Sequence, residues 1–585
     1  MKKICLSIIL LFSISIFAKN KAQLVQSNKI ECQIIKQSEK MSLNKCDNLK
    51  ILTLKGTPVE RARMHGELMN EEIQRDSMNF FSERIFQEVE DANFIVRGIF
   101  KSIYSNWIAK FYDSTPDEYL KEMEAQASGA KVDLEIFQRA FALPDTSAFL
   151  VNMPVRGFFN TFVSFGCTSV AKKNSDGHFF YGRNLDFSST LIFDKYPLMT
   201  IQIPEEGSQE LKHITFGTDG MQFGGITGVN EAGISFAVHQ FMSKDAEKFG
   251  MPMLFVGEEV LRKARTLEEA AEIIKKNKPG PLWGFVISDL NKQVTWTVEA
   301  SSQNFNIRKM DGNSFAQTNH LLATDTSLQI GNTGFVKNSI FRFNKALEMV
   351  NKKANTNSRD VAQILSYQSD ANGELSASED ILKGETIQAI IFESFENERK
   401  INISIDSAPA SSGRYAVFNM VSLFSAPEKI DFEINDLSNT PKEKRKNQLK
   451  LSLAAQYQDK GLLKEAIDQF VGQKSLDSQI YRAVGFYNIE KYDEVKKIVS
   501  ELKKSISNNN LSGQSVLWIE MLTLNKLKKT KEAKLAAEEI LKLDIHDSNL
   551  KKIAEKIKNG KSLDDTDENL KYSLFSGYVT NETFQ

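Results

Sequence analysis

Phe165-Gly-Cys-Thr-Ser-Val and Tyr181-Gly-Arg-Asn-Leu-Asp-Phe are the two stretches that decide the fold of this chain. Between them lies the turn signal Asn174-Ser-Asp-Gly, so the two stretches are predicted to pair as a β-hairpin. A hairpin of this length brings Arg183 and Asp186 back beside Cys167. A thiol next to a cation and a carboxylate is a candidate nucleophile, because the cation favours the thiolate. The alternative is a buried core cysteine beside a structural ion pair.

Gly-Cys-Thr-Ser at 166–169, followed by Gly-Arg-Asn-Leu-Asp-Phe at 182–187, resembles the N-terminal-nucleophile hydrolases of the choloylglycine hydrolase and penicillin acyltransferase superfamily. The resemblance covers about residues 50–425. It implies an α+β fold, a four-layer αββα sandwich, in which the chain cuts itself between Gly166 and Cys167. The freed α-amine of Cys167, whose ordinary pKa is about 7.7–8.0, would then be the base for its own thiol.

The resemblance also implies roles for four further residues. Asp186 is expected to hold the freed amine, and Arg183 to lie beside the thiol. Asn319, in Ala316-Gln-Thr-Asn-His, matches an asparagine whose side-chain amide donates to the oxyanion. Arg342, in Ser339-Ile-Phe-Arg-Phe, matches a late active-site arginine. The alternative interpretations are a structural ion pair, a turn-forming asparagine and an arginine on a helix surface.

A second oxyanion donor is expected near a glycine-rich turn, Gly228-Val-Asn-Glu-Ala-Gly-Ile, which matches a turn of the same superfamily. The bile-salt enzymes of that superfamily place an asparagine ten residues beyond the asparagine of this turn. Counting from Asn230 places Gln240 at that position. A single-residue bulge would place His239 there instead.

Two motifs before the hairpin narrow the resemblance to the penicillin acyltransferase branch, the isopenicillin-N acyltransferase-like proteins. They are Gly56-Thr-Pro-Val-Glu-Arg-Ala-Arg-Met-His-Gly, at the start of a predicted helix, and the later Ala127-Ser-Gly-Ala. We interpret His65, inside the first motif, as a packing or capping residue rather than a catalytic one.

Composition and charge are ordinary for a globular protein of 585 residues, with 41% hydrophobic and 25% charged residues. The formal net charge of −1 gives no electrostatic case for nucleic-acid binding. Met1-Lys-Lys and the apolar run that follows predict a signal peptide over residues 1–18, and therefore export to a bacterial periplasm or exterior. The run is too short to span a membrane, and no later stretch qualifies.

The cysteine count agrees with export. Loss of Cys5 with the signal peptide leaves Cys32, Cys46 and Cys167. In an oxidising compartment Cys32 and Cys46 could pair as a disulfide, and Cys167 would remain as a free thiol. The alternative is two unpaired thiols in a flexible leader. Nucleophilic catalysis would explain why an exported protein keeps an odd thiol.

Changes in composition and periodicity divide the chain. Residues 19–166 are predicted to be a helical prosegment that becomes a separate, still-associated chain after cleavage; the alternative is an ordinary N-terminal domain. Residues 167–430 alternate apolar strands with helical stretches and form the predicted catalytic domain. Residues 431–448 are predicted as a linker, 449–560 as a helical domain and 561–585 as a polar tail.

The helical region 449–560 carries a weak internal repeat. Glu-Ala or Glu-Val recurs at Glu465, Glu494 and Glu532, at intervals that bracket the tetratricopeptide period of ~34 residues. This pattern predicts a degenerate, tetratricopeptide-like repeat that binds a protein partner. The alternative is a plain helical bundle that covers the catalytic domain.

Other chemistries have little support in the sequence. The six histidines are scattered without metal-ligand spacing, and no phosphate loop is visible, so we expect no metal and no cofactor. The predicted function is hydrolysis of a linear amide C–N bond in an N-acylated small molecule, through a thioester acyl-enzyme. Three alternatives stay open: acyl transfer to an amine, phospholipase-B-like ester hydrolysis, and a non-catalytic binding protein that uses its helical repeats.

Overall fold

The structure is a computed structural model, and it describes residues 32–78, 94–150, 165–187, 197–218, 224–246, 249–330, 334–504, 506, 511–543 and 548–580. The predicted signal peptide over residues 1–18 lies outside the described residues. Within the described residues, none of the helices combines the length and the apolar character that crossing a bilayer requires.

A ten-stranded sheet forms the first half of the core. Its strands, in spatial order, are β1 (Gln33–Gln37), β2 (Met41–Cys46), β3 (Leu49–Gly56), β6 (Pro197–Pro204), β7 (His213–Thr218), β8 (Thr227–Asn230), β9 (Ile234–Gln240), β10 (Trp283–Asp289), β11 (Val294–Ala300) and β12 (Phe305–Lys309). β3 pairs with β6 in parallel, and the other neighbours pair antiparallel. The sheet therefore joins the segment before Cys167 to the segment after it.

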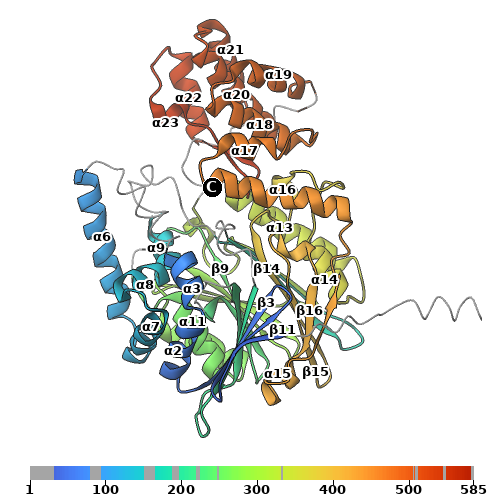
Figure 1. The fold of residues 1–585 in the computed structure, drawn as a ribbon. Coiled ribbons are helices and arrows are strands. Elements are labelled where there is room, and N and C mark those ends of the chain that lie inside the picture. The colour runs from blue at the N-terminus through green and yellow to red at the C-terminus, as the bar shows by residue number, and fades with distance from the viewer. Residues whose placement is uncertain are drawn as a thin grey trace, which may run out of the picture.

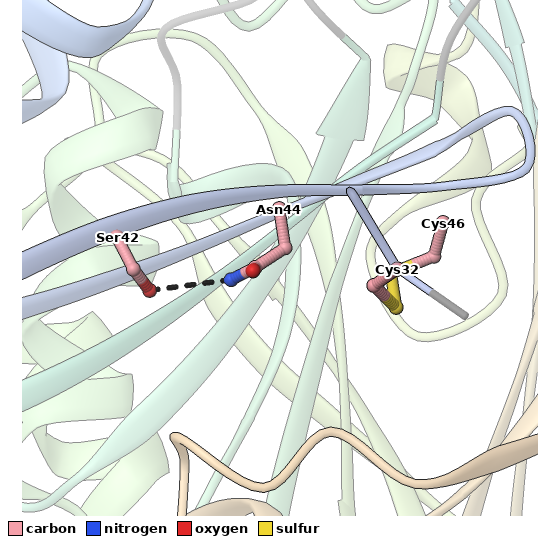
Figure 2. The surroundings of a disulfide bond; sticks show 4 residues. All are labelled: Cys32, Ser42, Asn44 and Cys46. Atoms are coloured by element: carbon pink, nitrogen blue, oxygen red, sulfur yellow. Dashed lines mark hydrogen bonds between the residues drawn. A yellow bond between two sulfur atoms is a disulfide. The ribbon is translucent and has the colours of Figure 1, made fainter. Parts of the chain in front are cut away.

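The predicted helical prosegment over residues 19–166 begins, in its described part, with strands β1 to β3. The apolar run Ile51-Leu-Thr-Leu predicts a strand and lies in β3, but the prediction of a helical segment is wrong for β1 and β2. β1 is exposed along its whole length, so its polar side chains gave no apolar alternation to detect. β3 is buried at six of its eight positions, because it lies inside the sheet rather than at its edge. Cys32 and Cys46 are joined by a disulfide (Sγ–Sγ 2.02 Å), which fastens the start of β1 to the end of β2 (Figure 2).

A seven-stranded sheet forms the second half of the core. Its strands, in spatial order, are β13 (Ser314–Gln317), β4 (Phe165–Lys173), β5 (Phe179–Phe187), β14 (Thr386–Phe395), β15 (Glu398–Ser404), β16 (Tyr415–Asn419) and β17 (Phe432–Asn435). β4 and β5 form the predicted hairpin, with Gly177 at φ 88° in the turn. The register places Ser169 opposite Arg183 and Gly166 opposite Asp186. The two stretches quoted first are thus adjacent strands.

The two sheets pack face to face, with helices on both outer faces. One buried cluster lies between the sheets and includes Ile51 and Val286 of the first with Phe392 and Ile403 of the second. A second cluster packs helices against the ten-stranded sheet: α2 (Pro58–Leu68), α7 (Asp117–Ala130), α8 (Leu134–Phe141), α11 (Met253–Lys263) and α12 (Leu267–Asn277). A third packs α13 (Gly334–Asn351) and α14 (Ser358–Leu365) against the seven-stranded sheet. The predicted mixed α and β fold is confirmed.

Smaller elements complete this part of the chain. They are α3 (Asn70–Glu72), a π-helical turn (Ile73–Met78), α6 (Phe94–Asp113), α9 (Leu143–Leu150) and α15 (Met420–Ser425), with 3-10 turns at Gly224–Ile226, Thr326–Leu328, Ala377–Glu379 and Ala410–Ser412. Figure 1 shows α2, α7, α8 and α11 together on one side of the sheets and α13 and α14 on the other.

The C-terminal region is helical up to residue 558 and has its own buried cluster. Its helices are α16 (Lys442–Asp459), α17 (Leu463–Asp468), α18 (Leu476–Asn488), α19 (Tyr492–Leu502), α20 (Leu511–Lys526), α21 (Thr530–Ile540), α22 (Ser548–Lys558) and α23 (Asp565–Glu568). Figure 1 shows α18 to α22 gathered beyond the sheets, with α16 next to α13.

Two predicted boundaries need correction. The predicted linker 431–448 contains β17, an edge strand that still pairs with β16, and the start of α16. The predicted polar tail 561–585 contains α23 and a hairpin of β18 (Lys571–Ser573) and β19 (Tyr578–Thr580). Residues 572–576 of this hairpin are buried. Both segments have a polar composition overall, because their strands are too short to show an apolar period.

The helices α2 and α7 approach each other closely through two glycines, Gly66 and Gly129. A Cβ atom at Gly66 would lie 2.2 Å from the main-chain oxygen of Gln126, and one at Gly129 would lie 2.3 Å from that of Arg63. This contact explains why both N-terminal motifs contain a glycine. His65 is half-buried in the same contact, with its Nδ1 atom 3.0 Å from Nε2 of Gln126, as expected for a packing residue.

Gly129→Ala is expected to lower the free energy of unfolding by about 1–3 kcal/mol, because the new methyl group meets main-chain atoms that cannot move independently. The control is Gly98→Ala on α6, where a Cβ atom would meet no described atom outside its own helix within 4 Å, so the change should stabilise by about 0.5–1 kcal/mol. Thermal and urea unfolding of both variants, each in a Cys167→Ala background, give the comparison. Equal stabilities for the two variants would mean that α2 and α7 do not touch at Gly129.

Candidate active site

Cys167 lies on β4 between the two sheets, and it is fully buried. Its main-chain groups are held on both sides. The N–H donates to Oδ1 of Asn319 at 2.9 Å, and the carbonyl oxygen accepts from Nη1 of Arg342 at 2.5 Å. The peptide groups that flank this side chain are thus fixed by two residues that come from 152 and 175 positions later in the chain.

The Cys167 thiol lies against Arg183, as predicted from the hairpin. Nη2 of Arg183 donates to Sγ at 3.3 Å and to the carbonyl oxygen of Val238 at 2.8 Å. The thiol itself donates to that same carbonyl at 3.3 Å. Nη1 of Arg183 is hydrogen-bonded to Thr227, which fixes the guanidinium.

Burial raises the pKa of the Cys167 thiol, and Arg183 opposes that rise without overcoming it. Arg183 therefore acts in the predicted direction, because its charge favours the thiolate. In the continuous chain, however, desolvation is the larger effect. The thiol is accordingly protonated near neutral pH and donates its proton to Val238.

Asp186 lies on β5 directly opposite Gly166. Its Oδ1 atom accepts a hydrogen bond from the hydroxyl of Thr386 at 2.7 Å. Its Oδ2 atom is buried and has no hydrogen-bond partner among the described residues, and a Cβ atom at Gly166 would lie 2.9 Å from it. Burial raises the pKa of Asp186, against the lowering effect of Arg342 and the Thr386 hydrogen bond. An open acceptor thus lies beside the residue that precedes Cys167.

Asn319 follows β13 and is fully buried. Its Oδ1 atom accepts from the Cys167 N–H and, at 2.8 Å, from Nη2 of Arg342. Its Nδ2 atom donates to the carbonyl oxygen of Gln240 at 3.0 Å. Its own N–H donates to Oγ of Ser339 at 2.6 Å. In the continuous chain the side chain of Asn319 therefore positions the main chain of Cys167.

Arg342 is buried on α13 rather than exposed on a helix surface. Nε donates to Oδ1 of Asn338 at 2.9 Å, and Nη1 donates to the hydroxyl of Thr168 at 2.9 Å as well as to Cys167. Burial lowers the pKa of Arg342 to about 10, so the guanidinium keeps its charge at neutral pH. Four hydrogen-bonding oxygens surround it: those of Cys167, Thr168, Asn319 and Asn338.

Gln240 and His239, the two candidates for a second oxyanion donor, have different surroundings. Gln240 meets the site through its main-chain oxygen, which accepts from Asn319. His239 has its Nδ1 atom 3.1 Å from the carbonyl oxygen of Thr318 and its Nε2 atom 2.8 Å from Oγ of Ser169. Burial, and then Arg183, hold the pKa of His239 well below its ordinary value, so the ring is neutral. Because a carbonyl can only accept, Nδ1 carries the proton and Nε2 accepts from Ser169.

Several residues of this site escaped the sequence analysis: Thr168, Thr227, Val238, Asn338, Ser339 and Thr386. Asn338 could have been found, since it lies four residues before Arg342 on a predicted helix and so on the same face. Val238 contributes only a main-chain oxygen, which no sequence pattern reveals. Among the described residues, no group of three or more His, Cys, Asp or Glu side chains could hold a metal ion.

These contacts define a site built around one buried cysteine. Residues 170–408 match the model of the family described as acyl-coenzyme A:6-aminopenicillanic acid acyl-transferase. The matched region begins just after Cys167 and contains Arg183, Asp186, Asn319 and Arg342. This match confirms the family resemblance predicted from the sequence.

Comparisons with individual proteins cover only part of the chain. An uncharacterized protein of Archaeoglobus fulgidus is 24% identical over 279 residues, and since this is 45% of each protein, the match spans about half the length of that relative. Penicillin V acylase from Agrobacterium tumefaciens has 15% identity and a TM-score of 0.29, over 46% of this chain and 91% of that one. The Caenorhabditis elegans ortholog of N-acylethanolamine-hydrolyzing acid amidase has 16% identity and a TM-score of 0.28, over 38% of this chain and 92% of that one.

The raised pKa of Asp186 leads to a prediction for the uncut protein. In a Cys167→Ala background, Asp186→Asn is expected to raise the melting temperature at pH 8. Burial favours the protonated form of this carboxyl in the folded chain, so the contribution of Asp186 to stability is complete below its unfolded pKa of about 3.9. That contribution is lost as the pH rises through the raised, folded pKa. The gain from Asp186→Asn should therefore shrink as the pH is lowered toward 4.

Asp176→Asn, on the exposed turn of the same hairpin, is the matched control. The backbone N–H of His178 lowers the pKa of Asp176, so the same change there should bring no gain at pH 8. Melting curves from pH 4 to pH 8 distinguish the two positions. A gain at position 186 that does not depend on pH would contradict the assigned shift.

Proposed function

We propose that this protein is a self-processing cysteine amidohydrolase that cleaves a linear amide C–N bond in an N-acylated small molecule. The observation that carries the proposal is the open, buried Oδ2 atom of Asp186 beside Gly166, next to a thiol that Arg183 contacts. The match of residues 170–408 to an acyl-transferase family supports acyl-group chemistry. Assignment of the helix–sheet–sheet–helix layers to the N-terminal-nucleophile fold is part of the same proposal.

The first step is a cut between Gly166 and Cys167. Sγ adds to the carbonyl carbon of Gly166, the C–N bond breaks, and the nitrogen of Cys167 takes up the proton that the thiol gives up. Water then hydrolyses the thioester, which leaves a carboxylate on Gly166 and restores the thiol. The products are a carboxyl end at Gly166 and a free α-amine on Cys167.

The second reaction uses the same thiol on an external amide. The α-amine removes the thiol proton, Sγ attacks the substrate carbonyl, and the leaving amine carries the proton away. Oδ2 of Asp186 is an unused acceptor close to the new amine and would hold it. Arg183 stabilises the thiolate, and the side-chain Nδ2 group of Asn319, which donates to Gln240 in the uncut chain, is assigned as an oxyanion donor. Arg342 would keep Asn319 and Cys167 in place.

Transfer of the acyl group to an amine is the second candidate, because the matched family is named for that reaction. Hydrolysis and transfer share the thioester, and they differ in whether water or an amine resolves it. Addition of an amine acceptor to the assay separates them, since an N-acylated acceptor forms only in transfer.

Self-processing is tested by intact mass and N-terminal sequencing of the purified protein. The wild-type protein should yield two chains, the larger beginning at Cys167, and Cys167→Ala should remain one chain. Ser175→Ala, on the exposed turn of the same hairpin, is the control and should be cut as the wild type is. The cut protein should release p-nitroaniline from N-acyl-p-nitroanilides, and Cys167→Ala should release none. A single uncut wild-type chain would refute the proposed self-processing and the mechanism that depends on it.

Two further parts of the proposal are export of the protein and a tetratricopeptide-like docking role for residues 449–560. The disulfide between Cys32 and Cys46 supports export, because such bonds persist in oxidising compartments. Thiol titration of the denatured mature protein should find only Cys167 before reduction, and Cys32, Cys46 and Cys167 after it. Titration of Cys5 as a further thiol would show that the leader is retained, and reactive Cys32 and Cys46 before reduction would exclude the disulfide.

A further inference from the structure

The hairpin of β18 and β19 brings a C-terminal side chain to the candidate active site. Phe575, in the turn of this hairpin, is buried and packs with Met242, Phe335 and Val336. Its ring stacks on that of Phe335, with 5.6 Å between centroids and 22° between planes. None of these residues belongs to the sequence patterns that identify the site.

The ring of Phe575 touches the residue before the nucleophile. A Cβ atom at Gly166 would lie 2.1 Å from Cζ and 2.3 Å from Cε2 of Phe575. The ring also lies below two cations, with Cζ of Arg342 at 5.4 Å and Nζ of Lys383 at 5.2 Å from its centroid. A cation near the face of an aromatic ring attracts it, so the two cations help to hold the ring against Gly166.

The hairpin is itself firmly placed. The Gly577 N–H donates to the carbonyl oxygen of Ser573 at 2.9 Å, and a Cβ atom at Gly577 would lie 2.3 Å from the main-chain nitrogen of Ser378. Asn488 of α18 donates to the carbonyl oxygen of Leu570 at 2.8 Å. The C-terminal helices therefore hold the hairpin, and the hairpin holds Phe575.

The proposed chemistry implies that the contact between Phe575 and Gly166 limits which acyl groups the enzyme accepts. In the self-cut, the acyl group that becomes attached to Sγ is that of Gly166. In the second reaction, the acyl group of the substrate becomes attached to the same Sγ, under the same oxyanion donors. The α-carbon of the substrate acyl group must therefore occupy the place of the Cα atom of Gly166. The group that contacts this Cα in the uncut chain will contact the acyl α-carbon in the cut enzyme.

We propose that Phe575 is a specificity-determining residue that admits acyl groups with an unbranched α-carbon and excludes those that carry an α-methyl group on its side. The proposal rests on the proposed function. A methyl group in the position of a Gly166 Cβ would collide with the ring, whereas a CH₂ group fits as glycine does. Met242, Phe335 and Val336 pack with the ring, so an acyl chain that extends along it would meet apolar side chains.

The test compares N-hexanoyl-p-nitroanilide with N-(2-methylhexanoyl)-p-nitroanilide, the latter as separate enantiomers. The wild-type enzyme should show a kcat/KM for the linear amide that is about tenfold or more above that for one branched enantiomer, as expected for one methyl group in a fitted pocket. Phe575→Ala should reduce that ratio about tenfold, chiefly through the branched substrate. Phe575→Leu should give an intermediate ratio, and it replaces the alanine variant in the test if that variant does not fold.

Leu574→Ala is the matched control. Leu574 is the neighbouring residue, but its side chain packs into the cluster of the C-terminal helices and not with Phe575. This change loosens the same hairpin and should leave the ratio as in the wild type. Equal ratios in the wild type and in both Phe575 variants would overturn the inference while leaving the hydrolase proposal intact. A wild-type protein that is not cut, or that cleaves neither amide, would overturn both.

Discussion

The arrangement of the site depends on the burial of one cation, the guanidinium of Arg342. Removal of such a group from water costs several kcal/mol unless hydrogen bonds replace its hydration. Here the replacements are oxygen atoms of Cys167, Thr168, Asn319 and Asn338, which belong to β4, to the segment after β13 and to α13. None of these acceptors is a carboxylate, so among the described residues no direct ion pair cancels the positive charge. The same group that aligns three segments therefore also supplies a positive field at the cysteine.

That field acts against desolvation, and in the uncut chain desolvation is the stronger of the two. Burial raises the pKa of both Cys167 and Asp186, although Arg183 and Arg342 pull the two pKa values down. Burial in the continuous chain thus favours the protonated forms of both the thiol and the carboxyl. A free α-amine would change this balance, because a cation next to Asp186 favours its ionised form. The amine and the carboxylate would thus become available for the reaction on an external amide only after the chain has been cut.

How much of this was readable from the sequence depends on the distance between the interacting residues. The β4–β5 hairpin could be predicted because a turn signal and two flanking strands are local features, and its register brought Arg183 and Asp186 to Cys167. Asn319 and Arg342 were reached only by resemblance, since nothing local ties them to a strand more than 150 residues earlier. Phe575 and Thr386 were missed, because each meets the site through tertiary packing alone. Strands β1 and β2 were missed for another reason: β1 is an edge strand whose side chains are all exposed, and β2 is too short to show a clear apolar period.

The parallel pairing of β3 with β6 means that the proposed cut would change how reversibly the protein folds. Seven residue pairs, from Lys50 with Leu198 to Gly56 with Pro204, join the segment before Cys167 to the segment after it. A chain cut after Gly166 would become a two-subunit complex whose interface is the inside of a sheet. Folding of the intact chain is an intramolecular event, whereas reassembly of the cut chains is a bimolecular one and depends on concentration. The cut would therefore make unfolding effectively irreversible, because two separated chains at low concentration would rarely reassemble.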